Sequence, residues 1–145
     1  MTIDVDQIKE RLSEEGYEIL PTGDPLVFRV RDLESGLIAT SALEENILFN
    51  TVACFTLPRE RITLELTRKL LDADNGIETS AFQLYSLPGG DESVVLTNFC
   101  KLQSLGLPSL ERERLGAEDE DDILSCLSFL FVDVLAARTL LTDYA

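Results

Sequence analysis

The C-terminal part of the chain constrains the fold most, because an acidic run there is followed by apolar residues at helical spacing. Residues 118–122 are five consecutive acids. Carboxylates are favourable in the first turn of a helix, where they face the positive end of the helix dipole. Apolar residues then recur at intervals of three and four as far as Leu141, which is the pattern of an amphipathic helix. The sequence therefore predicts one long C-terminal helix over residues 118–141.

The N-terminal half indicates one helix followed by strands. Asp4 and Gln7 resemble a capping box, and the apolar spacing that follows predicts a helix over about residues 4–15, ended by Gly16. The period then changes to two, and in residues 26–31 one face carries Leu26, Phe28 and Val30. We expect an antiparallel meander with strands at residues 17–20, 26–31, 37–40 and 47–55.

The middle of the chain predicts a second helix and a hairpin. Pro58 suits the first turn of a helix, in which Ile62, Leu66 and Leu70 share one face, and residues 75–76 supply a left-handed stop. Two strands, residues 79–87 and 93–101, flank the turn at residues 88–91. The pattern in residues 104–117 is weak, so we expect a loop or a short irregular segment there.

The predicted order is helix, three or four strands, helix, two strands and helix. This order favours an α+β fold with one antiparallel sheet, since strands and helices do not alternate throughout the chain. With 145 residues, the chain has the usual size of one domain, so residues 1–145 are expected to fold as a single domain.

The net charge limits the classes of partner. The chain carries 27 acids against 12 bases, for a net charge of −15, and its bases form no run. Such a surface repels nucleic acid and anionic lipid headgroups. Residues 1–7 lack the features of a secretory signal, and the best apolar stretch, residues 123–137, is interrupted by Ser125, Ser128 and Asp133. We expect a soluble cytoplasmic protein that binds neither nucleic acid nor membrane.

The residues available for catalysis argue against an enzyme. The chain has no histidine, no GxSxG elbow and no phosphate-binding loop, so no cofactor is expected. Cys54, Cys100 and Cys126 lie far apart in the sequence and include no CxxC pair. This distribution suits a reducing compartment and predicts three small core residues rather than a metal site.

Two acidic segments carry carboxylates that could bind a cation. The acids at residues 118–122 offer the ligands that calcium and magnesium prefer, but consecutive residues point around a helix instead of converging. Asp72, Asp74 and Glu78 do not match a calcium loop, because Gly76 falls at the fifth position. No metal site is assigned, although a small-molecule or metal-responsive regulatory domain that uses residues 118–122 stays as the alternative function.

Surplus apolar surface points to an interface. Phe129, Val132 and Ala136 fall opposite the core-facing side of the C-terminal helix, so they mark either an interface or a surface covered by the same chain. In the strand at residues 47–55, Phe49 and Phe55 lie on one face, while the other face is also apolar. A sheet that is apolar on both faces needs two covers, and a second subunit would supply one. These five residues are the candidate dimer or partner interface.

The element order, the small size, the acidity and the amphipathic C-terminal helix together resemble the type III secretion chaperone-like fold. That fold includes the secretion chaperones, bacterial domains of the YbjN sensory-regulator type and uncharacterised cyanobacterial families. The resemblance covers residues 4–141 and departs at residues 104–117. It implies a homodimer with a twisted antiparallel sheet, no cofactor, and a hydrophobic surface that holds a peptide or protein. The main hypothesis is therefore a non-catalytic, homodimeric, chaperone-like binding module of the bacterial cytoplasm.

Overall fold

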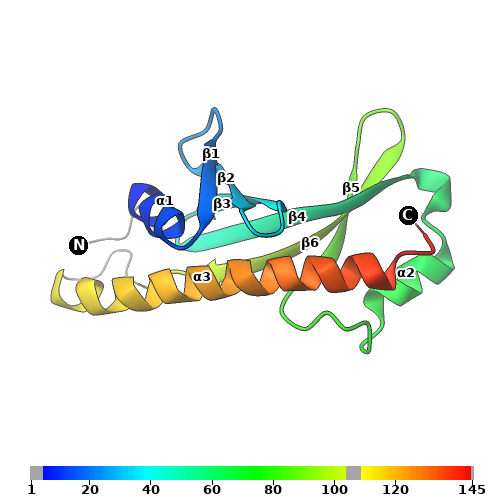
Figure 1. The fold of residues 1–145 in the computed structure, drawn as a ribbon. Helices are drawn as coiled ribbons and strands as arrows, with labels where there is room; N and C mark the ends of the chain where they lie inside the picture. Colours follow the sequence, from blue (N-terminus) through cyan, green and yellow to red (C-terminus); the bar gives the residue numbers. More distant parts are fainter. Residues whose placement is uncertain (1–4, 104–108, 145) are drawn as a thin grey trace. The chain divides into compact units, whose positions relative to one another are not determined.

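The computed structural model describes residues 5–103 and 109–144, and within the last helix it describes side chains from residue 118 onward (Figure 1). Helices and strands are combined as an α+β fold, and the predicted antiparallel sheet is confirmed. The elements are α1 (Val5–Glu14), β1 (Tyr17–Pro21), β2 (Val27–Asp32), β3 (Ile38–Glu44), β4 (Ile47–Pro58), η1 (Arg59–Arg61), α2 (Leu64–Leu71), β5 (Ala81–Ser86), β6 (Asp91–Lys101) and α3 (Ser109–Leu140). The strand order in the sheet is β1-β2-β3-β4-β6-β5.

The chain divides into two compact units. Unit 1 comprises Met1–Asn50 and Phe99–Ser128, and unit 2 comprises Thr51–Asn98 and Phe129–Ala145. Strands β4 and β6 and helix α3 each contribute residues to both units. The two units are described separately below.

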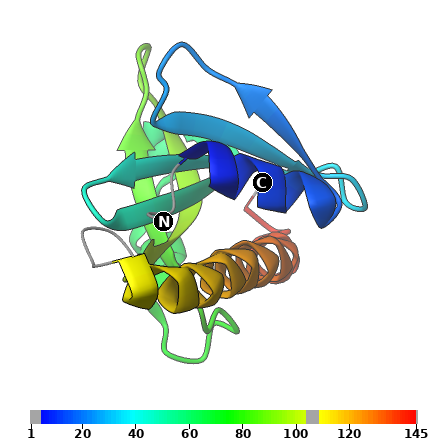
Figure 2. The same ribbon diagram turned by 90° about the vertical axis from the view of Figure 1, so that its left-hand side faces the viewer.

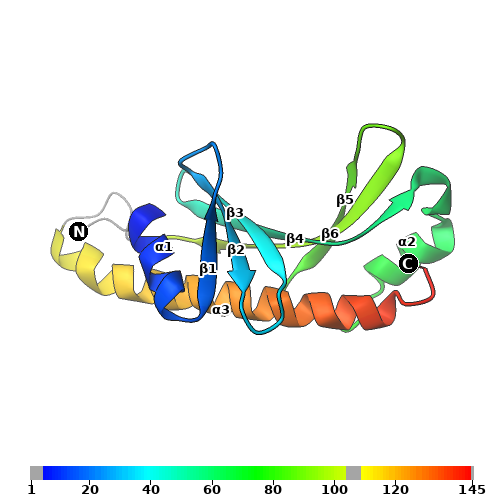
Figure 3. The same cartoon turned by 45° about the horizontal axis from the view of Figure 1, so that its top comes forward.

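In unit 1 the first three strands form a meander with a regular register (Figure 3). Val30 is paired with Ile19 of β1 and with Ala39 of β3. Phe28 and Val30 are fully buried, which confirms the alternation predicted for β2. The placement of Leu26 on that buried face is wrong, because its side chain is 49% exposed. Leu26 precedes β2, and its N–H is held by the side chain of Asp24 in a turn.

Two helices complete unit 1. α1 buries Ile8 and Leu12, while the first half of α3 buries Ile123 and Leu127. These are the apolar positions that the helical periodicity predicts. Figure 2 shows α1 between the first strands and the beginning of α3. The unit is thus built from strands and two helices whose apolar faces turn inward.

Unit 2 has its own hydrophobic core. Leu57, Leu66, Leu70, Val94 and Leu141 form a buried cluster drawn from β4, α2, β6 and the residue after α3. Helix α2 lies beside the end of α3 in Figures 1 and 3, as the shared cluster requires. The cluster is edged by partly buried side chains, namely Phe55, Ile62, Phe82, Leu140 and Tyr144.

The predicted start of the second helix at Pro58 is wrong. Pro58 is extended (φ −56°, ψ 147°) and leads into the short helix η1, and α2 begins only at Leu64. Thr63 caps α2, since its hydroxyl oxygen accepts a hydrogen bond from the N–H of Leu66 at 3.2 Å. Helix α2 begins after Thr63 because this side chain pairs a backbone N–H that the first turn leaves free.

Helix α2 ends at Leu71, before the stop predicted at residues 75–76. The side-chain amide of Asn75 donates to the carbonyl of Leu70 at 2.6 Å, and Gly76 has a φ of +84°. Asn75 therefore closes the end of the helix from four residues beyond it, while Gly76 provides the left-handed backbone that its missing side chain permits.

Helix α3 is longer than the sequence predicts. Residues 109–117 are helical, so the expected loop is wrong there, while residues 104–108 lie outside the described residues. This stretch lacks apolar periodicity but is rich in Leu, Glu and Arg, which have high helix propensity. Apolar periodicity alone therefore underestimates the length of the helix, because a charged helical segment has no apolar stripe.

Helix α3 also passes a membrane-span test by length and composition. In the described chain, Glu118–Leu140 is the one helical segment that does so, with a mean hydropathy of 1.8 over its best window. One helix of this kind is weak evidence for a membrane span, so the absence of a span stays a prediction. A core helix of a soluble protein passes the same test, and α3 places Leu127, Leu130 and Val134 at zero exposure.

Candidate protein-binding surface

Helix α3 carries an apolar stripe on its outer side in unit 2. Phe129, Val132 and Leu135 are 52%, 60% and 51% exposed, and we call these three residues the α3 stripe. Their spacing of three places them along one side of the helix. Ala136, predicted beside them, is half-buried. Of the two alternatives that the sequence left open, the structure leaves Phe129 and Val132 exposed in the single chain, and it adds Leu135 to the same side.

Asp133 does not belong to that exposed side. Its carboxylate is buried, with 7% exposure, and accepts three hydrogen bonds from the segment that leads into β5. The hydroxyls of Thr79 and Ser80 donate at 2.7 and 2.8 Å, and the N–H of Thr79 donates at 3.3 Å. A helical projection of the sequence cannot show this contact, because the segment that covers Asp133 is distant along the chain.

The two aromatic residues predicted on β4 lie in different units. Phe49 in unit 1 is half-buried, and its ring lies 6.2 Å from that of Phe99, measured between centroids. Phe99 is 64% exposed. Phe55 in unit 2 packs partly against the core cluster. Of the five predicted interface residues, Phe129 and Val132 therefore present the most free surface.

A second apolar surface in unit 2 was missed by the sequence analysis. An open hollow of about 230 Å³ is lined by residues of α2 and β5, namely Thr67, Leu70, Leu71, Phe82, Gln83 and Leu84, and we call it the α2–β5 hollow. Leu71 and Leu84 are 74% and 43% exposed there. The signal in the sequence was a pair of leucines, Leu64 and Leu71, seven residues apart and off the core face of α2.

Strand β5 borders this hollow and ends the sheet. Among the described strands, β5 pairs with β6 alone, with Phe82 opposite Leu96 and Leu84 opposite Val94. Most of its side chains are exposed. An edge strand offers backbone N–H and C=O groups to another extended chain. The hollow and the strand edge together form a surface suited to a peptide.

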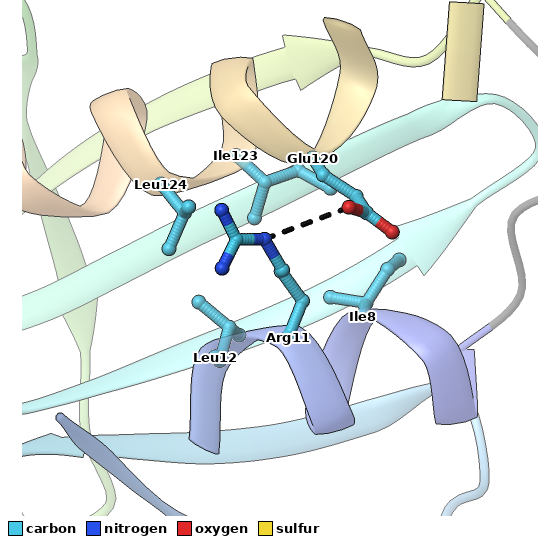
Figure 4. Close-up of a pocket in the computed structure, with 6 residues that line it drawn as sticks. All are labelled: Ile8, Arg11, Leu12, Glu120, Ile123 and Leu124. Atoms are coloured by element: carbon cyan, nitrogen blue, oxygen red, sulfur yellow. Dashed lines mark ion pairs between the residues drawn. The ribbon is translucent and has the colours of Figure 1, made fainter. Parts of the chain in front are cut away.

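In unit 1, the contact between α1 and α3 is filled and forms no ligand site (Figure 4). Nε of Arg11 lies 3.6 Å from a carboxylate oxygen of Glu120. The two side chains are surrounded by aliphatic residues of both helices, namely Ile8, Leu12, Ile123 and Leu124. Arg11 also donates a hydrogen bond to the carboxylate of Glu15, and this bond raises the pKa of the exposed guanidinium. The cluster joins two helices and leaves no room for a water molecule between them.

The acidic run of α3 diverges as expected. Asp119 is fully buried and accepts a hydrogen bond from the N–H of Gln103 at 2.8 Å. Glu120 faces Arg11, whereas Asp121 and Asp122 are exposed. Within the described residues, no three Asp, Glu, His or Cys side chains are grouped as metal ligands. The run lies inside α3, which already begins at Ser109, so the prediction that these acids form the first turn of the helix is wrong.

The cysteines are not all isolated. Cys54 in unit 2 is buried, and burial raises its pKa to about 11. In unit 1, however, the thiols of Cys100 and Cys126 are hydrogen-bonded to each other. This bond raises the pKa of Cys100 and lowers that of Cys126. The predicted core position is confirmed for Cys54 and Cys100, whereas Cys126 is half-buried, and the contact between Cys100 and Cys126 arises because the fold brings β6 and α3 together.

Comparison with known proteins shows a similarity in fold alone. No protein-family model and no curated protein matches the chain. Among solved structures, YbjN from E. coli, which is described as a proposed transcription regulator, aligns with a TM-score of 0.56 at 13% identity. The alignment covers 87% of this chain and 89% of that one. The predicted resemblance to YbjN-type domains is thus confirmed as a similarity in fold, over nearly the whole of both chains.

Proposed function

We propose that the protein is a non-catalytic, homodimeric binding module, chaperone-like in architecture, that holds an extended segment of a protein partner in the bacterial cytoplasm. The observation that carries the proposal is the α2–β5 hollow beside the edge strand β5. A peptide that adds to β5 gains backbone hydrogen bonds, and its alternate side chains point toward the hollow. The similarity to YbjN supports the fold that underlies the proposal.

The chemistry of the surface specifies the partner segment. Leu70, Leu71, Phe82 and Leu84 make the hollow mainly apolar, so aliphatic or aromatic side chains fit it. The net charge of −15 repels an acidic peptide. We therefore expect an extended segment with alternate apolar residues and no excess of acidic ones.

The α3 stripe is the proposed dimer surface. Each of its three large apolar side chains is more than half exposed in the single chain, and contiguous apolar surface of this kind marks interaction sites. In a symmetric dimer the same patch from both copies forms the contact, so a self-complementary apolar stripe suffices. Dimerisation would remove Phe129, Val132 and Leu135 from water.

Matched substitutions on α2 test the binding site. Leu71→Glu places a charge in the hollow, whereas Leu64→Glu changes a residue that is equally exposed, at 74%, and lies outside it. We expect wild type and Leu64→Glu to retain a partner captured from the native cell, and Leu71→Glu to lose it. Retention by both variants would remove the hollow from the proposal.

Light scattering tests the dimer. At micromolar concentration the wild type should give about twice 16.1 kDa. Phe129→Glu should give a folded monomer by circular dichroism, because a charge in a desolvated contact is costly unless it is paired. Leu33→Glu, which changes an exposed leucine of unit 1, should remain dimeric. A monomeric wild type would refute the dimer, and an unfolded Phe129→Glu would assign Phe129 to the core.

A further inference from the structure

The hydrogen-bonded thiols of Cys100 and Cys126 define a pair that the binding function does not use. Cys100 lies one residue before the end of β6, and Cys126 lies on α3, both within unit 1. The Cys126 thiol also donates to the carbonyl of Phe99, with 3.8 Å between sulfur and oxygen. Two contacts thus place the Cys126 sulfur against the end of β6, beside its partner thiol.

From this placement we propose that Cys100 and Cys126 are a redox-modified pair that forms a reversible disulfide on exposure to a peroxide. A disulfide is about 2 Å long, so the sulfurs have to approach from hydrogen-bonding distance. The pair joins elements that are separated along the chain by residues 101–125. The disulfide would therefore clamp the end of β6 to α3.

The different surroundings of the two thiols assign their roles. Cys126 is half-buried, while Cys100 is only 5% exposed. The mutual hydrogen bond lowers the pKa of Cys126 and raises that of Cys100, and burial of Cys100 adds to the difference. The thiolate is the nucleophile, so Cys126 reacts first and Cys100 resolves the product. Asp122 raises the pKa of both thiols, so at Cys126 it opposes the effect of the mutual hydrogen bond.

The chemistry balances with one peroxide per disulfide. The Cys126 thiolate attacks one oxygen of hydrogen peroxide, the O–O bond breaks, and the released hydroxide takes up a proton to form water. Cys126 becomes a sulfenic acid. The Cys100 sulfur then attacks the Cys126 sulfur, the S–O bond breaks, and hydroxide leaves with the Cys100 proton as a second water. Two thiols lose two electrons, and the peroxide gains them.

The sequence gives a direct test by peptide mapping. Trypsin cuts after Lys101 and Arg114, so the two cysteines fall in separate peptides, residues 70–101 and 115–138, and Cys54 falls in residues 32–59. After peroxide treatment and alkylation of the unfolded chain, we expect these two peptides to be joined with the loss of two hydrogens. Titratable thiols should fall from three to one per chain, and dithiothreitol should restore all three.

Three serine variants and the melting temperature complete the experiment. Cys54→Ser should retain the link, whereas Cys100→Ser and Cys126→Ser should lose it. The oxidised wild type should melt about 5 to 10 °C higher, because the link restricts the unfolded chain. Any of four results would overturn the proposal: an unchanged number of thiols, a link that includes Cys54, a disulfide between two chains, or overoxidised Cys126 without a disulfide. The peptide map of the wild type decides whether the disulfide forms, even if a variant does not fold. This result does not depend on partner binding.

Discussion

Replacing Asp133 with alanine tests how far one buried carboxylate holds unit 2 together. The side chain accepts hydrogen bonds from both donors of Thr79 and from the hydroxyl of Ser80. These residues immediately precede β5, the strand that borders the proposed binding site. Asp133→Ala should therefore weaken both the stability of unit 2 and the order of the segment that leads into β5.

The expected loss follows from the partners. A hydrogen bond to a charged group contributes about 1.5 to 3 kcal/mol, but such values do not add in full. Thr79 is exposed and Ser80 half-buried, so their hydroxyls turn to water in the variant. Removal of a buried charge also relieves a desolvation cost. We expect a net loss of about 2 to 3 kcal/mol in the free energy of unfolding, or about 5 to 10 °C in melting temperature.

Urea denaturation followed by circular dichroism measures the loss, and hydrogen exchange at the Thr79 amide locates it. Asp121→Ala is the matched control, because Asp121 is an exposed aspartate on the same helix. Its free energy of unfolding should change by no more than about 0.5 kcal/mol. If Asp133→Ala is as stable as this control and keeps the exchange rate of Thr79, the three hydrogen bonds contribute no net stability and the reasoning is refuted.

Three further substitutions or conditions have expected outcomes. Leu66→Ala should cost about 2 to 5 kcal/mol in urea denaturation, because Leu66 is fully buried in the core cluster of unit 2 and the smaller side chain leaves a cavity. Asn50→Ala should cost about 1 to 3 kcal/mol by the same assay, since it removes the acceptor that lies 2.7 Å from the buried hydroxyl of Ser41. Cys54 should resist alkylation at pH 8 in the folded chain, because burial raises its pKa to about 11. Because the fold raises the pKa of Cys54, the folded chain favours the neutral thiol. The stability linked to this preference is fully present below the pKa of the thiol in the unfolded chain, and it is lost as the pH rises toward 11.

Much of the fold could be predicted because it depends on local pattern. The alternation around Phe28 and Val30 predicts β2 and its buried face, and the spacing of Ile8 and Leu12 predicts α1. Each of these patterns records which side of an element faces the core. The start of the second helix was predicted wrongly at Pro58, because apolar spacing does not show the hydrogen bond by which Thr63 caps the helix.

The site residues that sequence analysis missed depend on contacts between distant segments. Cys100 and Cys126 form a pair only because β6 lies against α3, and no local spacing predicts this contact. Asp133 is buried because Thr79 and Ser80 cover it. For Phe129 and Val132 the sequence left open whether another segment covers them, and the structure shows both side chains more than half exposed.

The exposed stripe on α3 is better explained by a protein contact than by lipid. Helix α3 is apolar enough to cross a membrane, yet it contains the buried carboxylate of Asp133, whose hydrogen-bond partners lie in the same unit. An ionisable group in the middle of a membrane span is costly, and a net charge of −15 repels anionic headgroups. Burial at Leu130 and Val134 already uses the inner side of the helix. The outer side therefore needs a cover only as wide as the α3 stripe, and in the proposed dimer the same stripe of a second copy would provide it.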